Sequence, residues 1–228
     1  MLDPPEYLPI GGINDYIEFR HTPQVNEDAF NNGGYYIFYK IFDTDELTYD
    51  LDDLDDNGGV EQFEKNFKTS GALSLSNLEG MVNDPFNISP SGRYAYLMTI
   101  HEGTDIPDND TPYEFSIKSS TANTLNSYTE LEFVNTTLAP ETLITVYRHY
   151  SDELSVAHLE GFGLDYMEDN IDDDDFDLPT TIEFQSGSDY SLTVAFIGVT
   201  FGTNTDPEKI GQRLLSEPEF LGYIYLDK

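Results

Sequence analysis

An acidic stretch from Asp53 to Glu64 carries the one motif in the sequence whose residue types and spacing indicate a defined chemistry. It reads D-L-D-D-N-G-G-V-E-Q-F-E. Its oxygen-bearing side chains stand at loop positions 1, 3, 5, 9 and 12, with glycine at 6 and a branched apolar residue at 8, which is the spacing of an EF-hand calcium loop. The ligands predicted for calcium are Asp53, Asp55, Asn57, Gly59, Glu61 and Glu64.

The flanks of this loop favour a second interpretation. Asp52 stands where an entering EF-hand helix buries an apolar residue, and no second loop is present in the sequence to pair with the first. The alternative is therefore a solvated, acid-rich connection between two short helices. If calcium binds, we expect it to stiffen the surrounding segment and offset carboxylate repulsion rather than to act as a signal.

The charge balance excludes two classes of partner. The chain has 44 Asp and Glu against 10 Lys and Arg, for a formal net charge of -34. Nucleic acid and anionic membrane surfaces both need clustered basic residues, so neither is expected as a partner. Such a field attracts cations, although solubility or adaptation to a saline medium explains it equally well. Cysteine is absent, which excludes disulfides and thiol nucleophiles.

Catalytic motifs are lacking, and we expect a protein that is not an enzyme. The four histidines show no metal-binding spacing, and His101-Glu102 lacks the second histidine of H-E-x-x-H. No G-x-S-x-G elbow, phosphate-binding glycine loop or dinucleotide fingerprint is present. A carboxylate pair for glycoside hydrolysis stays open among so many acids. The 16 tyrosines could line a glycan- or protein-binding face, but their alternation favours ordinary sheet positions.

The N-terminal segment Leu2 to Pro9 indicates an extended, proline-stiffened tether. We expect such a tether in an exported protein whose signal has been removed. No apolar run in the sequence is long enough to span a bilayer as a helix. The expected location is therefore extracytoplasmic, in the cell envelope or at the cell surface.

Alternating apolar residues predict a mainly β chain. The Tyr35 to Phe42 segment is apolar on both faces, which predicts a central strand covered on both sides. A turn is expected at Asn32-Gly33-Gly34. The predicted strands are Tyr16–Arg20, Tyr35–Phe42, Tyr94–His101, Tyr113–Lys118, Thr129–Asn135, Leu143–Tyr150, Ser155–Glu160, Thr181–Phe184, Tyr190–Phe201 and Phe220–Leu226. Short helices are predicted at Asp43–Asp52, Val60–Lys68, Leu75–Val82 and from Asp206-Pro207 to Leu215.

Strands separated by polar turns, with a few short helices, favour an antiparallel β-sandwich that carries a large α+β insertion. Three segments resemble parts of a fibronectin type III domain. Gly34 to Lys40 resembles strand C, Phe184 to Ala195 resembles the approach to strand F with Tyr190 at the tyrosine corner, and Ser216 to Ile224 resembles strand G. The tryptophan usual in strand B is missing, since the chain has no Trp.

The same three segments, together with the N-terminal tether, resemble a group of uncharacterised lipoproteins of spirochaete-type bacteria. This resemblance covers about a quarter of the chain and implies a lipid anchor on the native protein, but no activity. It divides the chain into an extended tether (1–12), a fibronectin type III-like sandwich (13–43 plus 179–228) and an inserted β-rich subdomain with short helices at its start (44–178).

Two functions from different classes follow. The first is a non-enzymatic, acidic envelope or surface lipoprotein that acts as an interaction module for an unknown protein or glycan, as a monomer, with calcium stabilising its insertion. The second is an extracytoplasmic carbohydrate-binding or glycoside-hydrolysing protein, which needs an aromatic cleft. A purely structural spacer domain, with no ligand, is a third interpretation.

Overall fold

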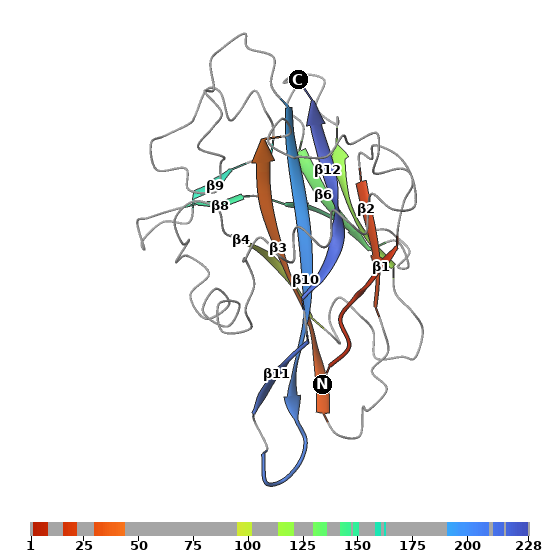
Figure 1. The fold of residues 1–228 in the computed structure, drawn as a ribbon, viewed down its shortest axis with the longest axis vertical. Coiled ribbons are helices and arrows are strands. Elements are labelled where there is room, and N and C mark those ends of the chain that lie inside the picture. Colours follow the sequence, from red (N-terminus) through yellow and green to blue (C-terminus); the bar gives the residue numbers. More distant parts are fainter. Residues whose placement is uncertain are drawn as a thin grey trace.

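Two antiparallel β-sheets make up the body of the protein and share one hydrophobic core (Figure 1). They are seen in a computed structural model of the chain. It describes residues 2–8, 16–21, 30–43, 95–101, 114–120, 130–135, 142–146, 148–150, 158–160, 162, 191–209, 212–216 and 218–227.

Sheet A has the strand order β1-β2-β5-β6-β7, and all of its neighbours are antiparallel. Its strands are β1 (Glu6–Leu8), β2 (Tyr16–Arg20), β5 (Glu114–Ser120), β6 (Glu130–Asn135) and β7 (Thr142–Val146). A separate two-stranded pair is formed by β8 (Arg148–Tyr150) and β9 (His158–Glu160).

Sheet B is built around two 14-residue strands, β3 (Phe30–Asp43) and β10 (Ser191–Asn204), which pair along their whole length. The strand β4 (Ala95–His101) lies on the other side of β3. The edge of β10 that faces away from β3 pairs with β12 (Glu219–Asp227) along its first part and with β11 (Arg213–Leu215) along its last part. The prediction of a mainly β, antiparallel, sandwich-like fold is therefore confirmed for the described residues.

The core lies between the sheets because alternate residues of each strand point to the same face. From β3 it takes Tyr35, Ile37, Tyr39 and Ile41, each at most 3% exposed. Sheet A supplies rings to the same cluster, including Phe19 and Phe115, whose centroids lie 5.4 Å apart. Burying each such side chain contributes roughly 1.5–3 kcal/mol to the stability of the fold. This burial stabilises the packing of one sheet on the other.

The outer face of sheet B is also apolar along its centre. Phe38 of β3 and the β10 residues Ile197 and Val199 are at most 4% exposed. Together with the position of β3 between β4 and β10, this confirms the prediction that Tyr35 to Phe42 forms a central strand buried on both faces.

Three local predictions are wrong. The single strand predicted over Leu143–Tyr150 is two strands, β7 in sheet A and β8 in the separate pair. The expected helix from Asp206-Pro207 to Leu215 stops after one turn, in which Asp206 Oδ1 accepts a hydrogen bond from the Glu208 amide. The chain then returns as strand β11, because Leu214 and Leu215 can pair with Gly202 and Phe201 of β10. The other three predicted helices lie outside the described residues, and the described residues contain no helix.

The expected turn at Asn32-Gly33-Gly34 is instead a β-bulge inside β3. Phe201 pairs with Gly34 and Gly202 with Asn32, so Gly33 is an extra residue in the ladder. Gly34 has φ +126°, and a Cβ there would lie 1.9 Å from the carbonyl oxygen of Ile100. The glycines therefore bend a continuous strand rather than end it.

The N-terminal segment that we expected to act as a tether is packed against the sandwich over residues 2–8. Leu2 is 2% exposed, and the Asp3 carbonyl accepts a 2.6 Å hydrogen bond from Thr200 Oγ1. Arg20 of β2 pairs with Glu6 of β1, with 2.7 Å between Nη2 and Oε2. The predicted boundaries of the three segments stay a prediction. However, two strands within 44–178 pair with strands of the predicted sandwich segment: β4 is hydrogen-bonded to β3, and β5 is hydrogen-bonded to β2.

A narrow β-ribbon continues sheet B beyond the sandwich, and we call it the arm. It consists of residues 30–33 of β3, 201–204 of β10, the turn at 205–209, and β11. Figure 1 shows the arm at the same end of the molecule as the N-terminus, with the C-terminus towards the other end. In the part of the chain that the structure describes, no helix is long and apolar enough to cross a membrane.

The bulge generates a stability prediction. Gly34→Ala should lower the free energy of unfolding by about 3 kcal/mol, because alanine disfavours φ +126° and its Cβ would collide with backbone of β4. Urea unfolding measures the change. Thr203→Ala, at an exposed position of the arm, is the matched control and should stay near the wild-type value. Equal midpoints for both variants would contradict the assignment.

Candidate functional site

All six predicted calcium ligands lie outside the described residues: Asp53, Asp55, Asn57, Gly59, Glu61 and Glu64. Calcium binding by that loop therefore stays a prediction. Tyr190, which the fibronectin type III resemblance places at a tyrosine corner, also lies outside. Within the described ranges, no group of three or more His, Asp or Glu side chains is arranged to hold a metal ion.

A partly exposed aromatic cluster lies where the arm joins the sandwich, and we call Tyr36, Phe201 and His101 the aromatic patch. The strand register places them together on the outer face of sheet B. Phe201 of β10 pairs with Gly34 of β3, which in turn pairs with His101 of β4. Tyr36 is two residues farther along β3 and pairs with Val199. Paired residues share a face of a sheet, so all three rings lie on one side.

The rings are in direct contact with one another. Tyr36 and Phe201 are stacked, with centroids 4.1 Å apart and an interplanar angle of 23°. His101 meets Phe201 edge-on, with centroids 6.0 Å apart at 84°. Tyr36 and Phe201 are half-buried and His101 is exposed. Because each ring limits the rotamers of the next, the aromatic patch is fixed before any ligand arrives.

Because Gly33 and Gly34 have no side chains, they leave space for the rings of the aromatic patch. A Cβ on Gly33 would lie 2.4 Å from Cε2 of Phe201, so that ring packs directly over the glycine backbone. Gly34 sits between Phe201 and His101 in the register and has no side chain to separate them. The bulge that bends β3 therefore also lets rings from β3, β4 and β10 meet.

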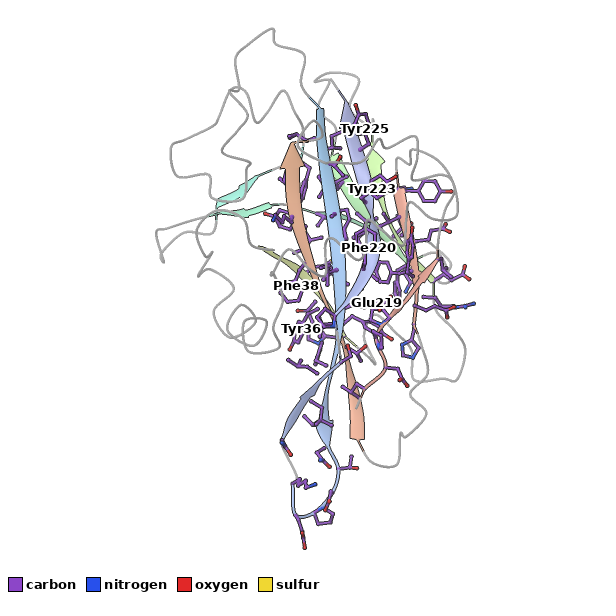
Figure 2. All side chains as sticks on the ribbon, viewed as in Figure 1. Tyr36, Phe38, Glu219, Phe220, Tyr223 and Tyr225 are labelled. Atoms are coloured by element: carbon purple, nitrogen blue, oxygen red, sulfur yellow. The ribbon has the colours of Figure 1, made fainter. Side chains whose placement is uncertain are left out.

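Two further half-buried tyrosines lie on the outer face of sheet B, on β12, separated from the aromatic patch by the buried side chains of Phe38 and Ile197. Tyr223 and Tyr225 pair with Ala195 and Thr193 of β10 and are half-buried. Figure 2 shows these two tyrosines along β12, with Tyr36 and Phe38 on the side of β3. Chemically this face offers flat apolar rings with polar tips, which suits binding by stacking and apolar contact.

A half-buried cation, Lys40, also lies on this face. Lys40 stands four residues beyond Tyr36 on β3 and pairs with Ala195. Burial, which disfavours the charged ammonium, lowers the pKa of Lys40 from its ordinary value. The outer face of sheet B thus combines rings with a cation near its centre.

His21 and Tyr35 form a buried polar pair that connects the two sheets. His21 follows β2 and is 6% exposed, while Tyr35 of β3 is fully buried. A hydrogen bond joins His21 Nδ1 and the Tyr35 hydroxyl, and their rings meet edge-on at 5.6 Å. The pair satisfies two buried polar groups, and its burial keeps it from contacting a large ligand.

Sequence reasoning did not identify the aromatic patch. Alternation predicts Tyr36 and Phe201 only as strand residues, and His101 ends a predicted strand without the second histidine of a metal motif. The usable signal was the Gly33-Gly34 pair beside a tyrosine, because glycine in a strand marks a bulge or a close approach. Which ring would fill that space depended on the pairing of β10 with β3.

No family model, no curated protein and no solved structure matches the chain.

The His21–Tyr35 pair generates a prediction about pH. Burial lowers the pKa of His21 from 6.5, so the unfolded chain binds its proton more readily than the folded one. The contribution of neutral His21 to stability is therefore complete above about pH 6.5 and is lost as the pH falls towards the folded pKa. His21→Asn, which keeps a hydrogen-bonding group, should weaken the fall in urea midpoint between pH 7.5 and pH 5.5. The control Thr203→Ala, which removes no titratable group, should keep the wild-type fall, and identical profiles for all three proteins would refute the prediction.

Proposed function

We propose that this protein is a non-enzymatic, exported binding module whose aromatic patch docks a partner. The observation that carries the proposal is the stacked, partly exposed pair Tyr36–Phe201 with His101 against it. Partly exposed aromatic rings that are already fixed by their neighbours lose little conformational entropy when a partner covers them. Tyrosine is also among the residues that most often dominate binding energy at interfaces.

The location proposed is the cell envelope or surface, with a lipid anchor on the native protein and no membrane-spanning helix. This part of the proposal rests on the resemblance of the N-terminal segment and three strands to lipoproteins of spirochaete-type bacteria. The excess of acids, 44 against 10 basic residues, fits a surface protein that stays soluble and monomeric.

We also propose that the sandwich is of the fibronectin type III kind. In such folds strand F lies between strands C and G, and strands A, B and E form the facing sheet. In support, β10 lies between β3 and β12, and β1, β2 and β5 are neighbours in sheet A. On this assignment β3, β10 and β12 are strands C, F and G.

A carbohydrate ligand is the second candidate, and the stacked pair Tyr36–Phe201 favours it specifically. Sugar rings also pack on aromatic side chains, and tyrosine hydroxyls beside them can hydrogen-bond to sugar hydroxyls. The proposal of a protein partner and this alternative place the ligand on the same patch, so one experiment can distinguish them.

The test is a photo-crosslink from the native cell envelope. A benzophenone amino acid replacing Tyr36 should give a discrete protein adduct on irradiation, because a partner docked on the aromatic patch would lie within reach of that side chain. Gel electrophoresis and mass spectrometry identify the adduct. The matched control carries the same group in place of Tyr16, which is 38% exposed on β2 of sheet A.

An adduct from position 36 alone supports the protein-binding module. An adduct of glycan composition at position 36 supports the carbohydrate alternative instead. The same products from both positions, or none from either, would falsify a binding role for the patch.

We further propose that the acidic loop from Asp53 to Glu64 binds calcium and stabilises the segment around it. The support is its spacing of oxygen donors and glycine, which matches an EF-hand loop. The carboxylates there repel one another in the absence of a cation, so binding should stabilise the folded chain by mass action.

Calcium should raise the melting midpoint by several degrees relative to EDTA, because it binds the folded loop and not the unfolded one. Differential scanning fluorimetry measures the shift. The variant Asp53→Ala with Glu64→Ala should lose it, whereas Glu6→Ala with Glu18→Ala removes two acids elsewhere and should keep it. A shift of the same size in both double variants would mean that calcium only screens the net charge.

A further inference from the structure

We propose that the partner presents a positively charged, arginine-containing segment to the aromatic patch. This inference rests on the proposed function and names the chemistry of its ligand. Three properties of the molecule lead to it: the net charge, the ring cluster, and the acidic turn at the tip of the arm.

Charge complementarity favours a cationic partner over a neutral or anionic one. A net charge of -34 on 228 residues gives the molecule a negative long-range potential, although Lys40 places a positive charge on the same face as the patch. Such a field accelerates the encounter with a basic segment and opposes the approach of an acidic one. A neutral glycan is neither attracted nor repelled by it, so the charge gives no support to the carbohydrate alternative.

The aromatic patch discriminates between kinds of cation. A guanidinium group is planar and weakly hydrated, so it packs on aromatic rings with less loss of hydration than a lysine ammonium. Tyr36 and Phe201 supply partly exposed rings for this contact, and exposed His101 stands at their edge. The arrangement therefore favours arginine over lysine at equal charge.

The arm offers a second contact for the same segment. Its turn exposes Asp206 and Glu208 together with one base, Lys209. The turn is held by hydrogen bonds from the Lys209 amide to the Asp206 carbonyl at 2.8 Å and from the Asn204 amide to the Gln212 carbonyl at 2.9 Å. Asp206 is five residues beyond Phe201, so an extended segment of roughly six residues, about 20 Å long, could reach both places.

The experiment measures binding of two labelled peptides, alternating Arg-Gly and alternating Lys-Gly, each with five positive charges. Fluorescence anisotropy with the full chain at 50 mM and 300 mM NaCl gives the dissociation constants. We expect the arginine peptide to bind at least threefold more tightly than the lysine peptide at both salt concentrations. Both should weaken at 300 mM, because charge attraction is screened.

Variants of the aromatic patch assign this preference to it. Tyr36→Leu should remove the arginine preference by lowering the affinity for the arginine peptide to that for the lysine peptide. The matched control Tyr16→Leu, in sheet A, should keep the preference. Circular dichroism and a thermal melt show whether each variant is folded.

A charge-reversal pair keeps the inference testable if Tyr36→Leu does not fold. His101→Lys should weaken binding of the arginine peptide several-fold, and His101→Glu should strengthen it. Both replace the same exposed ring, so their difference reports the charge beside the patch. Equal affinities for the two variants would overturn the inference.

Two further results would also overturn it: equal affinity of the wild type for the arginine and lysine peptides, or an arginine preference that Tyr16→Leu lowers as much as Tyr36→Leu. Neither result removes the proposed function, which fails only if the photo-crosslink at position 36 fails. A specific adduct at position 36 without an arginine preference would leave a binding module whose partner is recognised by apolar contact instead.

Discussion

The pairing of β3 with β10 is the interaction on which the described structure depends. The two strands run antiparallel from Leu192 opposite Asp43 to Asn204 opposite Phe30. One face of this pair supplies Tyr35, Tyr39, Val194 and Phe196 to the core between the sheets. β4, β11 and β12 add to its two edges. A shift of one residue would move every core side chain to the opposite face, so burial determines the register strongly.

The same pairing explains why a candidate site exists on the outer face. The register places Phe201 opposite Gly34, and the bulge at Gly33 lets its ring pack over the backbone of β3 and stack on Tyr36. Past this point the second sheet no longer accompanies the strands, and they continue as the arm (Figure 1). The aromatic patch therefore stands at the junction between the sandwich and the arm.

Closure of the sandwich near this junction depends on the N-terminal segment. Pro5 packs against Gly198, where a Cβ would lie 2.6 Å from its Cγ, and Leu2 is buried. The Thr200 hydroxyl donates a hydrogen bond to the Asp3 carbonyl, and the Thr200 backbone amide donates a 2.9 Å hydrogen bond to Ser216 Oγ. These contacts tie β10 to residues 2–5 and, separately, to Ser216 after β11. The arm and the N-terminus are thus parts of one packed end of the molecule.

Local sequence was sufficient for most strands and insufficient for the site. Alternation of large apolar residues predicts β2 with the bounds observed, β10 and β12 nearly so, and only the second half of β3, because period-two burial leaves a strong signal. Two local signals gave wrong predictions. Asn32-Gly33-Gly34 favours a turn, but pairing with β10 makes it a bulge within β3. Asp206-Pro207 favours a helix start, but the pairing of β11 with β10 makes it part of a hairpin turn. Charge, the absence of cysteine and the spacing of the acidic loop are likewise properties of the sequence alone. The tertiary structure decided that Tyr36, His101 and Phe201 meet, because rings so far apart in the chain are brought together only by the register of three strands.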